Sequence, residues 1–331
     1  MTEVKLGKDA VTLPVGTEAE RPSNPVTGMI RWNTDTDALE GYNGVEWAPI
    51  SSVPISATGG TISDVNIDGL DFRIHAFTST GTSSFEVVSL GTTDGEAEVL
   101  VVAGGGGGVN HSGGGGAGGV VDVQNVKLSP QNYTITVGDG GPGGFRGDFN
   151  RNENNGDDSS AFGFVAIGGG GGGHDTAEKG GDGGSGGGAH GGGSPGTGGD
   201  ALQPTSASGG FGNDGRDATE LHSAGGGAGE FPPTVKDAGD GVEFISIFGN
   251  SFGENGFFGG GGGAPNQVDT DSSDSGGAGG LGGGGDGGDE GGEGDPGLPN
   301  TGGGGGGSPR GGINQPGKPG GSGVVLIRYR I

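Results

Sequence analysis

Three clusters of acidic side chains carry the residue types that could bind a cation. The first contains Asp269, Asp271 and Asp274, and an Asp-X-Asp pair with a third carboxylate supplies the oxygen ligands that Ca²⁺ prefers. A calcium loop also needs a glycine for its sharp turn, whereas Asp274 is followed by serine. The other clusters lie at 152–158 and 286–295. We therefore favour a solvated acidic face and expect no cofactor, with calcium as the one candidate metal.

The five histidines lie far apart in the sequence, at His75, His111, His174, His190 and His222. Because the chain has no cysteine and no local histidine spacing typical of zinc sites, we expect loop or surface histidines rather than a metal centre. No glycine run ends in Gly-Lys-Ser/Thr, and no Gly-X-Ser-X-Gly elbow stands between a strand and a helix. The sequence therefore predicts a protein that is not an enzyme.

Three glycine-flanked loops combine phenylalanine with polar residues and are the best candidates for a contact surface, because loops on a rigid scaffold often carry recognition. The candidate contact residues are Phe145, Arg146, Phe149, Arg151, Phe211, Asn213, Arg216, Phe252, Phe257 and Phe258. The alternative is that the phenylalanines cap a glycine-rich core where strands end. The absence of tryptophan and tyrosine from these loops argues against a lectin.

Composition limits the partners. The 331 residues include 93 glycines, 27% apolar residues and 15 basic against 41 acidic side chains, for a net charge of −26. So few basic groups predict no nucleic-acid binding and no attraction to an anionic membrane surface. The chain has no cysteine, no apolar run of membrane-spanning length and no N-terminal signal pattern. Low hydrophobicity with high charge is also typical of disorder, so packing has to be argued from the pattern.

Residues 1–52 contain both tryptophans and almost no glycine runs. Strands are expected at 29–33, 38–42 and 45–50, with Asn43-Gly44 as a two-residue hairpin turn. We predict a compact β-module that is too small to be very stable alone.

Residues 53–102 have ordinary composition and are expected to be β-rich. Apolar residues alternate at 72, 74 and 76 and again at 85 and 87, which predicts half-buried strands. The run at 99–103 is continuously apolar and should be covered on both faces.

From residue 103 onward, long glycine tracts alternate with short strands. Strands are expected at 120–128, 133–137, 162–167, 243–248 and 324–331. A linker would not carry strands at such intervals, so we expect 103–331 to be one folded domain.

Glycine recurs at every third residue within the tracts, without a miss in 276–297. Collagen is excluded because the tracts are interrupted and proline totals only 17. A polyproline-II helix has three residues per turn, so this period leaves bare backbone stripes against which neighbours can pack. In 180–199 two phases are almost all glycine, and the third carries Asp182, Ser185, Thr197 and Asp200, which suits a solvent face.

Ordering a glycine backbone costs about 1–2 kcal/mol per residue, so such helices need hydrogen bonds to one another. The alternative is a flexible glycine coil. The phasing and the regular strands favour packing, and the predicted fold is mainly β plus a polyglycine/polyproline-II helix bundle, with almost no α-helix.

Five motifs, in the order EAEVLVVAGGGGG, HSGGGGAGGVVDV, YTITVGDGGPGG, AIGGGGGG and GSGVVLIRYRI, resemble the glycine-rich domain of bacteriophage and metagenomic tail-fibre-type proteins. This resemblance covers 97–331. Separately, GMIRWNTDTDALEGYNGVEWAPI is similar to a short module of phage tail fibres and baseplate-associated proteins.

The resemblance implies a virion protein, made in the host cytoplasm, that forms a tail fibre or other appendage, often as a homotrimer. Residues 1–52 would attach to other tail or neck proteins, 53–102 would connect or oligomerise, and loops of 103–331 would bind a host surface polysaccharide or outer-membrane protein. The candidate contact residues would then bind that receptor. Alternatives are a purely structural decoration or fibre protein, a polysaccharide-cleaving fibre, and an extracellular ice-binding or structural glycine-rich protein, although a charge of −26 does not suit an ice-binding face.

Overall fold

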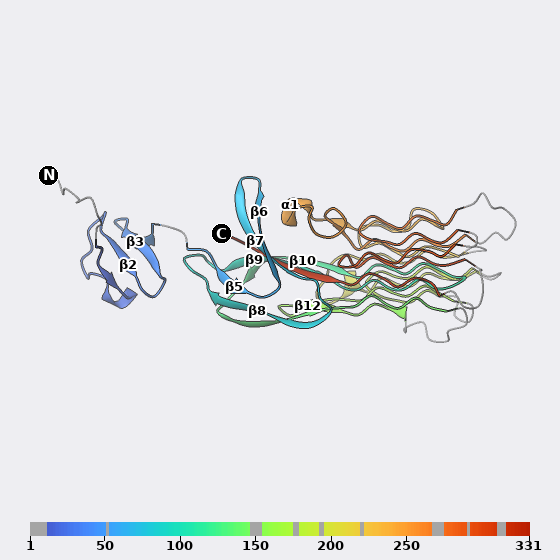
Figure 1. The fold of residues 1–331 in the computed structure, drawn as a ribbon. Coiled ribbons are helices and arrows are strands. Elements are labelled where there is room, and N and C mark those ends of the chain that lie inside the picture. The colour runs from blue at the N-terminus through green and yellow to red at the C-terminus, as the bar shows by residue number, and fades with distance from the viewer. Residues whose placement is uncertain are drawn as a thin grey trace.

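The computed structural model of the chain describes residues 12–50, 53–145, 154–174, 179–191, 195–218, 222–266, 275–289, 292–309 and 316–331. Figure 1 shows a small N-terminal sheet, a group of longer strands, and glycine-rich segments that run side by side away from those strands. The chain is mostly β-structure with almost no helix, which confirms that part of the expected fold. Among these residues, no helix is long and apolar enough to cross a membrane.

The strands are β1 (Val15–Gly16), β2 (Ile30–Asn33), β3 (Ala38–Tyr42), β4 (Trp47–Pro49), β5 (Ser56–Thr58), β6 (Thr61–Ile67), β7 (Leu70–Phe77), β8 (Gly81–Ser89), β9 (Glu96–Val102), β10 (Val120–Lys127), β11 (Gln131–Val137), β12 (Ser159–Ala161), β13 (Phe164–Ala166), β14 (Val242–Glu243), β15 (Phe257–Phe258) and β16 (Val324–Arg330). The helices are η1 (Glu18–Glu20), η3 (Gln203–Thr205) and α1 (Ile245–Phe248).

The N-terminal sheet has the order β1-β2-β3-β4 and is built around a buried carboxylate. Glu40 accepts hydrogen bonds from Arg21 Nη2 at 2.6 Å and from Asn33 Nδ2 at 3.1 Å. The bond from Arg21 holds the pKa of Glu40 below its usual value. Tyr42 pairs with Trp47, so four residues connect β3 to β4, and the expected two-residue turn is wrong.

Two five-stranded sheets, ordered β10-β9-β16-β7-β6 and β13-β12-β11-β8-β5, share one apolar core. Phe85 and Ile135 from one sheet pack with Val99 and Ile327 from the other. The opposite face of the first sheet is covered by a second cluster that includes Phe248, from α1. The run at 99–103 is therefore covered on both faces, as its composition predicts.

A buried histidine links β7 to the C-terminal strand β16. The His75 Nδ1–H donates to Gly59 O at 2.7 Å, and His75 Nε2 accepts from the Tyr329 hydroxyl at 2.9 Å. Burial lowers the pKa of His75 and raises the pKa of Tyr329 to about 12, so both groups are neutral at pH 7.

One expected strand is wrong, and another is shorter than expected. Within 243–248, only Glu243 is extended, as the end of β14, and α1 follows, because Phe244 and Phe248 are buried at helical spacing. Within 162–167, Phe162 and Gly163 have φ values of 54° and 86° and form the turn between β12 and β13, which pair as a hairpin.

The glycine tracts are joined by backbone hydrogen bonds between tracts rather than by strand ladders. Along 104–108, the N–H groups donate to several neighbours in turn, and the same neighbour returns after three residues. The donor–acceptor pairs, at 2.8–3.1 Å, are Gly104–Asp157, Gly105–Gly321, Gly106–Gly116, Gly107–Asn154 and Gly108–Lys318. Carbonyls of this tract accept from three further segments, at 141–144, 169–172 and 305. One tract is thus bonded to six others.

This spacing leaves no room for a side chain at most glycine positions of the tracts. A Cβ at Gly106 would overlap the carbonyl of Gly170. Alanine fits where methyl groups meet one another, as at Ala224, Ala238 and Ala264. Ser185, which the phasing placed on a solvent face, is fully buried, because its N–H reaches Ala117 O at 2.9 Å inside the tracts.

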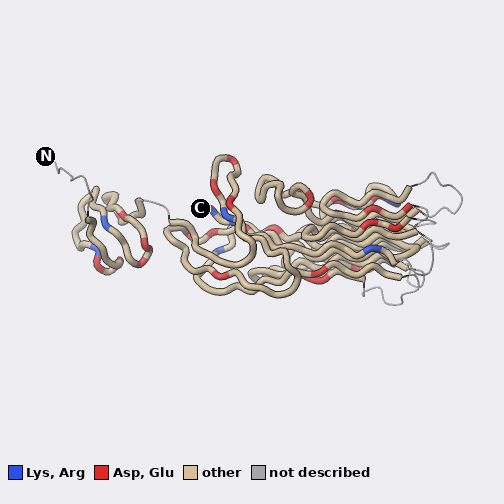
Figure 2. The backbone as a smooth tube through the Cα atoms, viewed as in Figure 1, with Lys and Arg blue, Asp and Glu red and all other residues tan. Residues whose placement is uncertain are grey.

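Carboxylates accept N–H groups at the solvent side of the outer tracts, and Figure 2 shows acidic residues spread along these segments. The donor–acceptor pairs, at 2.7–3.0 Å, are Gly168–Asp158, Gly198–Asp217, Ala201–Asp214, Gly276–Asp289, Ala278–Asp237, Gly279–Asp286, Leu281–Asp240, Gly282–Glu254 and Gly283–Glu254. The acidic residues therefore complete the hydrogen bonding of the tracts as well as facing water.

Replacing an interior glycine should destabilise the fold strongly. In Gly106→Ala the new methyl group overlaps a neighbouring backbone, which should lower the free energy of unfolding by about 3 kcal/mol in chemical denaturation. The control is Gly292→Ala, where the nearest atom lies 3.6 Å from the added Cβ, and where we expect a change within about 0.5 kcal/mol. Equal effects at the two positions would contradict tight packing of the tracts.

Removing one carboxylate acceptor should have a smaller effect. Asp286→Ala leaves the N–H of Gly279 without its 2.7 Å acceptor and should cost about 1 kcal/mol of unfolding free energy. Asp286→Asn keeps an acceptor oxygen of the same reach, so most of that loss should be recovered. If both variants match the wild type, the carboxylate contributes only surface charge.

Candidate functional site

The glycine tracts leave the sheets and end at a common far end. β9 continues into 103–108, and 113–119 returns to β10, with the chain reversing around Asn110 and Ser112. Figure 1 shows that the tracts extend away from the sheets in one direction. We use "far end" for the tract ends that lie away from the sheets. Inside the tracts, the close approach of neighbouring backbones excludes most side chains. Larger side chains can be accommodated at the far end, so a functional site is expected there.

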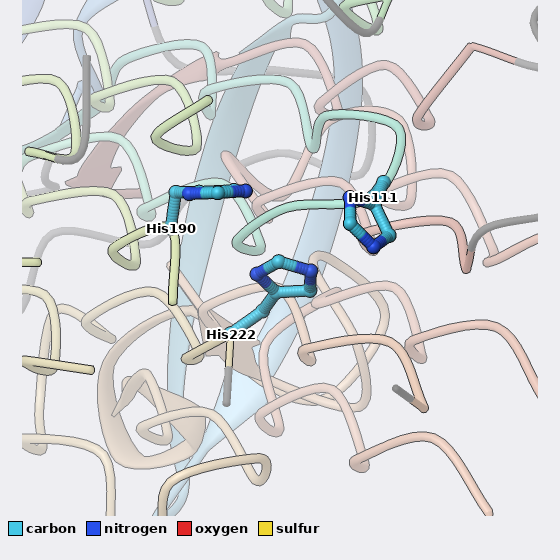
Figure 3. Close-up of side chains that lie close together, drawn as sticks. All are labelled: His111, His190 and His222. Carbon is cyan, nitrogen blue, oxygen red and sulfur yellow. The ribbon is translucent and has the colours of Figure 1, made fainter. Parts of the chain in front are cut away.

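Three histidines from distant parts of the sequence meet at the far end. Figure 3 shows His111, His190 and His222 turned toward one another. One ring nitrogen from each lies within 4.8 Å of the others. The ring centroid of His222 is 4.7 Å from those of both His111 and His190, and the latter two are 6.0 Å apart. His190 and His222 are buried, and His111 is half-buried.

Hydrogen bonds between the tracts explain this convergence. The N–H of Gly114 donates to Ser223 O at 3.1 Å, and the N–H of Gly188 donates to Gly114 O at 2.9 Å. Each of these three residues lies one to three positions from one histidine of the group. The register of three neighbouring tracts therefore places the three imidazoles at one level.

Local backbone geometry also sets the rings. His111 has a φ of 53°, in the left-handed region that costs an L-residue energy and that glycine adopts freely. The ring of His222 accepts a hydrogen bond at Nδ1 from the N–H of Gly191 at 3.1 Å. In this neutral tautomer the proton of His222 is on Nε2, which is then a hydrogen-bond donor.

The expectation of loop or surface histidines is wrong for four of the five. His174, His190 and His222 are buried because the tracts that carry them are interior, and His75 is buried on β7, where its ring lies 5.0 Å from that of Phe85. The sequence does contain a signal for this group of histidines. His-Ser begins two tracts, at 111–112 and 222–223, and these tracts run side by side, while His190 interrupts a glycine phase.

The expected contact residues do not form one surface. Phe145 is 46% exposed and follows Gly144, whose carbonyl accepts from Asn110 at the far end. Phe211 is 42% exposed but lies at the sheet end, where its N–H donates to Val120 O at 2.8 Å. The two phenylalanines are exposed to a similar extent and lie at opposite ends of the tracts.

The remaining described candidates are tied into the fold. Asn213 Nδ2 donates to Gly227 O at 2.9 Å, and Arg216 Nη1 donates to Pro232 O at 2.7 Å. Phe258 is fully buried in the second apolar cluster, and Phe252 packs against that cluster. Phe257 is half-buried and forms β15 with Phe258.

Some expected residues lie outside the described part of the chain. They are Arg146, Phe149 and Arg151 of the contact set and Asp269, Asp271 and Asp274 of the candidate calcium site.

Comparison with known sequences addresses the long C-terminal part. No curated protein gives a significant match. The sequence model of a family described as a glycine-rich domain matches residues 78–330, a span that begins between β7 and β8 and takes in all the tracts together with the whole of β16. This match covers well over half of the chain, and the protein therefore belongs to the glycine-rich domain family.

Proposed function

We propose that the glycine tracts are polyglycine-II helices packed as a bundle. Such a helix has three residues per turn and no internal hydrogen bonds, so its N–H and C=O groups must point outward to neighbours. The return of the same neighbour after three residues along 104–108, and the six bonded neighbours of that tract, support this assignment. The overlap that a Cβ would make in the tracts supports it as well.

We propose further that the protein is a non-enzymatic structural component of a bacteriophage virion, a tail fibre or another appendage, that binds a host surface. The observation that carries this proposal is the set of tracts anchored on the sheets and ending together at one far end (Figure 1). A rigid scaffold that presents its turns at one end suits the binding of a surface polysaccharide or outer-membrane protein. The similarity to tail-fibre-type sequences points the same way.

The proposed division of labour follows the sheet pairing. Residues 1–52 would attach the chain to other tail or neck proteins. β16, which follows the last glycine tract, lies between β7 and β9 in one sheet. Residues 53–102 would therefore anchor the glycine tracts. The same region would also assemble the chain into a homotrimer. Phe145 is the exposed candidate receptor contact at the far end.

Hydrogen exchange should test the bundle. If the tracts are packed helices, amides in 104–119 should exchange about 10,000-fold more slowly than in an unstructured peptide, because they open only on global unfolding. The measurement is exchange followed by mass spectrometry on the full chain, with strands β9 and β10 as internal references. Exchange of the tracts at unstructured rates, beside protected strands, would support a flexible coil instead.

Binding to bacteria should separate the two exposed phenylalanines. Labelled full-length protein, titrated onto a panel of bacterial strains and their isolated surface polysaccharides, should bind a subset of strains. Phe145→Ala should weaken that binding by about tenfold or more, because an aromatic side chain that becomes buried in an interface typically contributes much of the binding energy. Phe211→Ala, at the sheet end, should leave it unchanged.

The same incubations should release no reducing sugar, since no cleavage is proposed. Melting curves of both variants control for loss of folding. Loss of binding in Phe211→Ala alone would move the contact surface to the sheet end. Binding to no strain would favour the purely structural decoration.

A further inference from the structure

We propose that His111, His190 and His222 form a site for one divalent transition-metal ion at the far end of the tracts. The inference rests on the side-chain geometry and stands independently of the adhesive role.

The ligand set defines the class of metal. Three imidazoles with no carboxylate or thiolate among them favour borderline ions such as zinc, nickel or copper, and do not suit Ca²⁺ or Mg²⁺, which prefer oxygen. Within the described ranges, this is the single group of three or more histidine, aspartate or glutamate side chains whose ligand atoms converge. Three protein ligands leave one position of a tetrahedral ion for water or an external ligand.

The nitrogens need only a modest approach to bind an ion. A zinc–nitrogen distance of about 2.0–2.1 Å places tetrahedral ligand atoms about 3.3 Å apart. The three nitrogens already lie within 4.8 Å of one another, so rotation about the side-chain torsions can close the gap. His111 is on the turn and half-buried, and its ring has the most room to move.

Metal binding has a definite cost at His222. Its Nδ1 lone pair accepts the N–H of Gly191, and a neutral imidazole has one lone pair only. An ion bound at Nδ1 replaces that hydrogen bond, and an ion bound at Nε2 moves the ring proton to Nδ1, which also ends it. The amide of Gly191 therefore reports on binding in either geometry.

The ion would join three chain segments directly through their side chains, beside the hydrogen bond from the N–H of Ala189 to Ser223 Oγ at 2.8 Å. His190 lies 79 positions after His111 in the sequence, and His222 lies 32 positions after His190. Backbone hydrogen bonds also join segments at this level, as between the N–H of His111 and Ser308 O at 2.7 Å and between the N–H of Ser223 and Ala189 O at 3.1 Å. A metal bound to the folded form only would stabilise the far end and fix its turns in position.

The test is calorimetric titration of ZnCl₂ into metal-free full-length protein. We expect one zinc per chain, with His190→Gln and His222→Gln each weakening the affinity by about 100-fold or more. His174→Gln changes a buried histidine outside the group and should leave zinc affinity and stoichiometry unchanged. CaCl₂ and MgCl₂ should give no competition.

A measurement on the wild type avoids dependence on variants that fail to fold. Zinc X-ray absorption of the 1:1 complex should show about three imidazole nitrogens at about 2.0–2.1 Å, and the amide resonance of Gly191 should shift on zinc binding. The proposal is overturned if zinc gives no binding, if its shell contains only oxygen, or if both variants bind like the wild type. If zinc does not bind, the three imidazoles form a hydrogen-bonded group without a metal.

Discussion

Backbone hydrogen bonds between glycine tracts are the interaction on which this structure depends. A buried N–H or C=O group that lacks a partner is costly, and the tracts contain neither helical nor strand ladders that would supply one. Each residue of 104–108 finds its partner on a neighbouring tract instead, at 2.8–3.1 Å. This approach is open to bare backbone alone, because a Cβ at a position such as Gly106 overlaps the next tract. Glycine content is therefore the packing requirement of the fold and not a sign of flexibility.

The same constraint reconciles the composition with a packed chain. An apolar content of 27% and a net charge of −26 are typical of disorder when side chains form the core. Here backbone atoms fill much of the interior, and the two sheets supply conventional apolar clusters to which the tracts are anchored. Carboxylates such as Asp286 then accept N–H groups on the outer tracts, so part of the negative charge completes the hydrogen bonding.

Close packing of glycine backbones also restricts where functional side chains can lie. Within the tracts there is little room for functional side chains, and at their ends the restriction lifts. The half-exposed Phe145 and the group of His111, His190 and His222 both lie at the far end. A surface contact and a metal site at the same end would have different consequences, one for binding to a host and the other for the stability of the turns.

The sequence by itself determined the longer strands and the kind of interior. The apolar run at 99–103 requires cover on both faces, the run at 324–330 forms a buried strand, and the three-residue glycine period indicates close backbone packing. Tertiary structure decided which tracts are neighbours. Every tract presents the same row of glycine backbone at every third residue, so the local sequence does not select a partner. Burial of Ser185 and convergence of the three histidines both follow from that choice of neighbours. The helix at 245–248 was also decided there, since Phe248 turns toward the sheet.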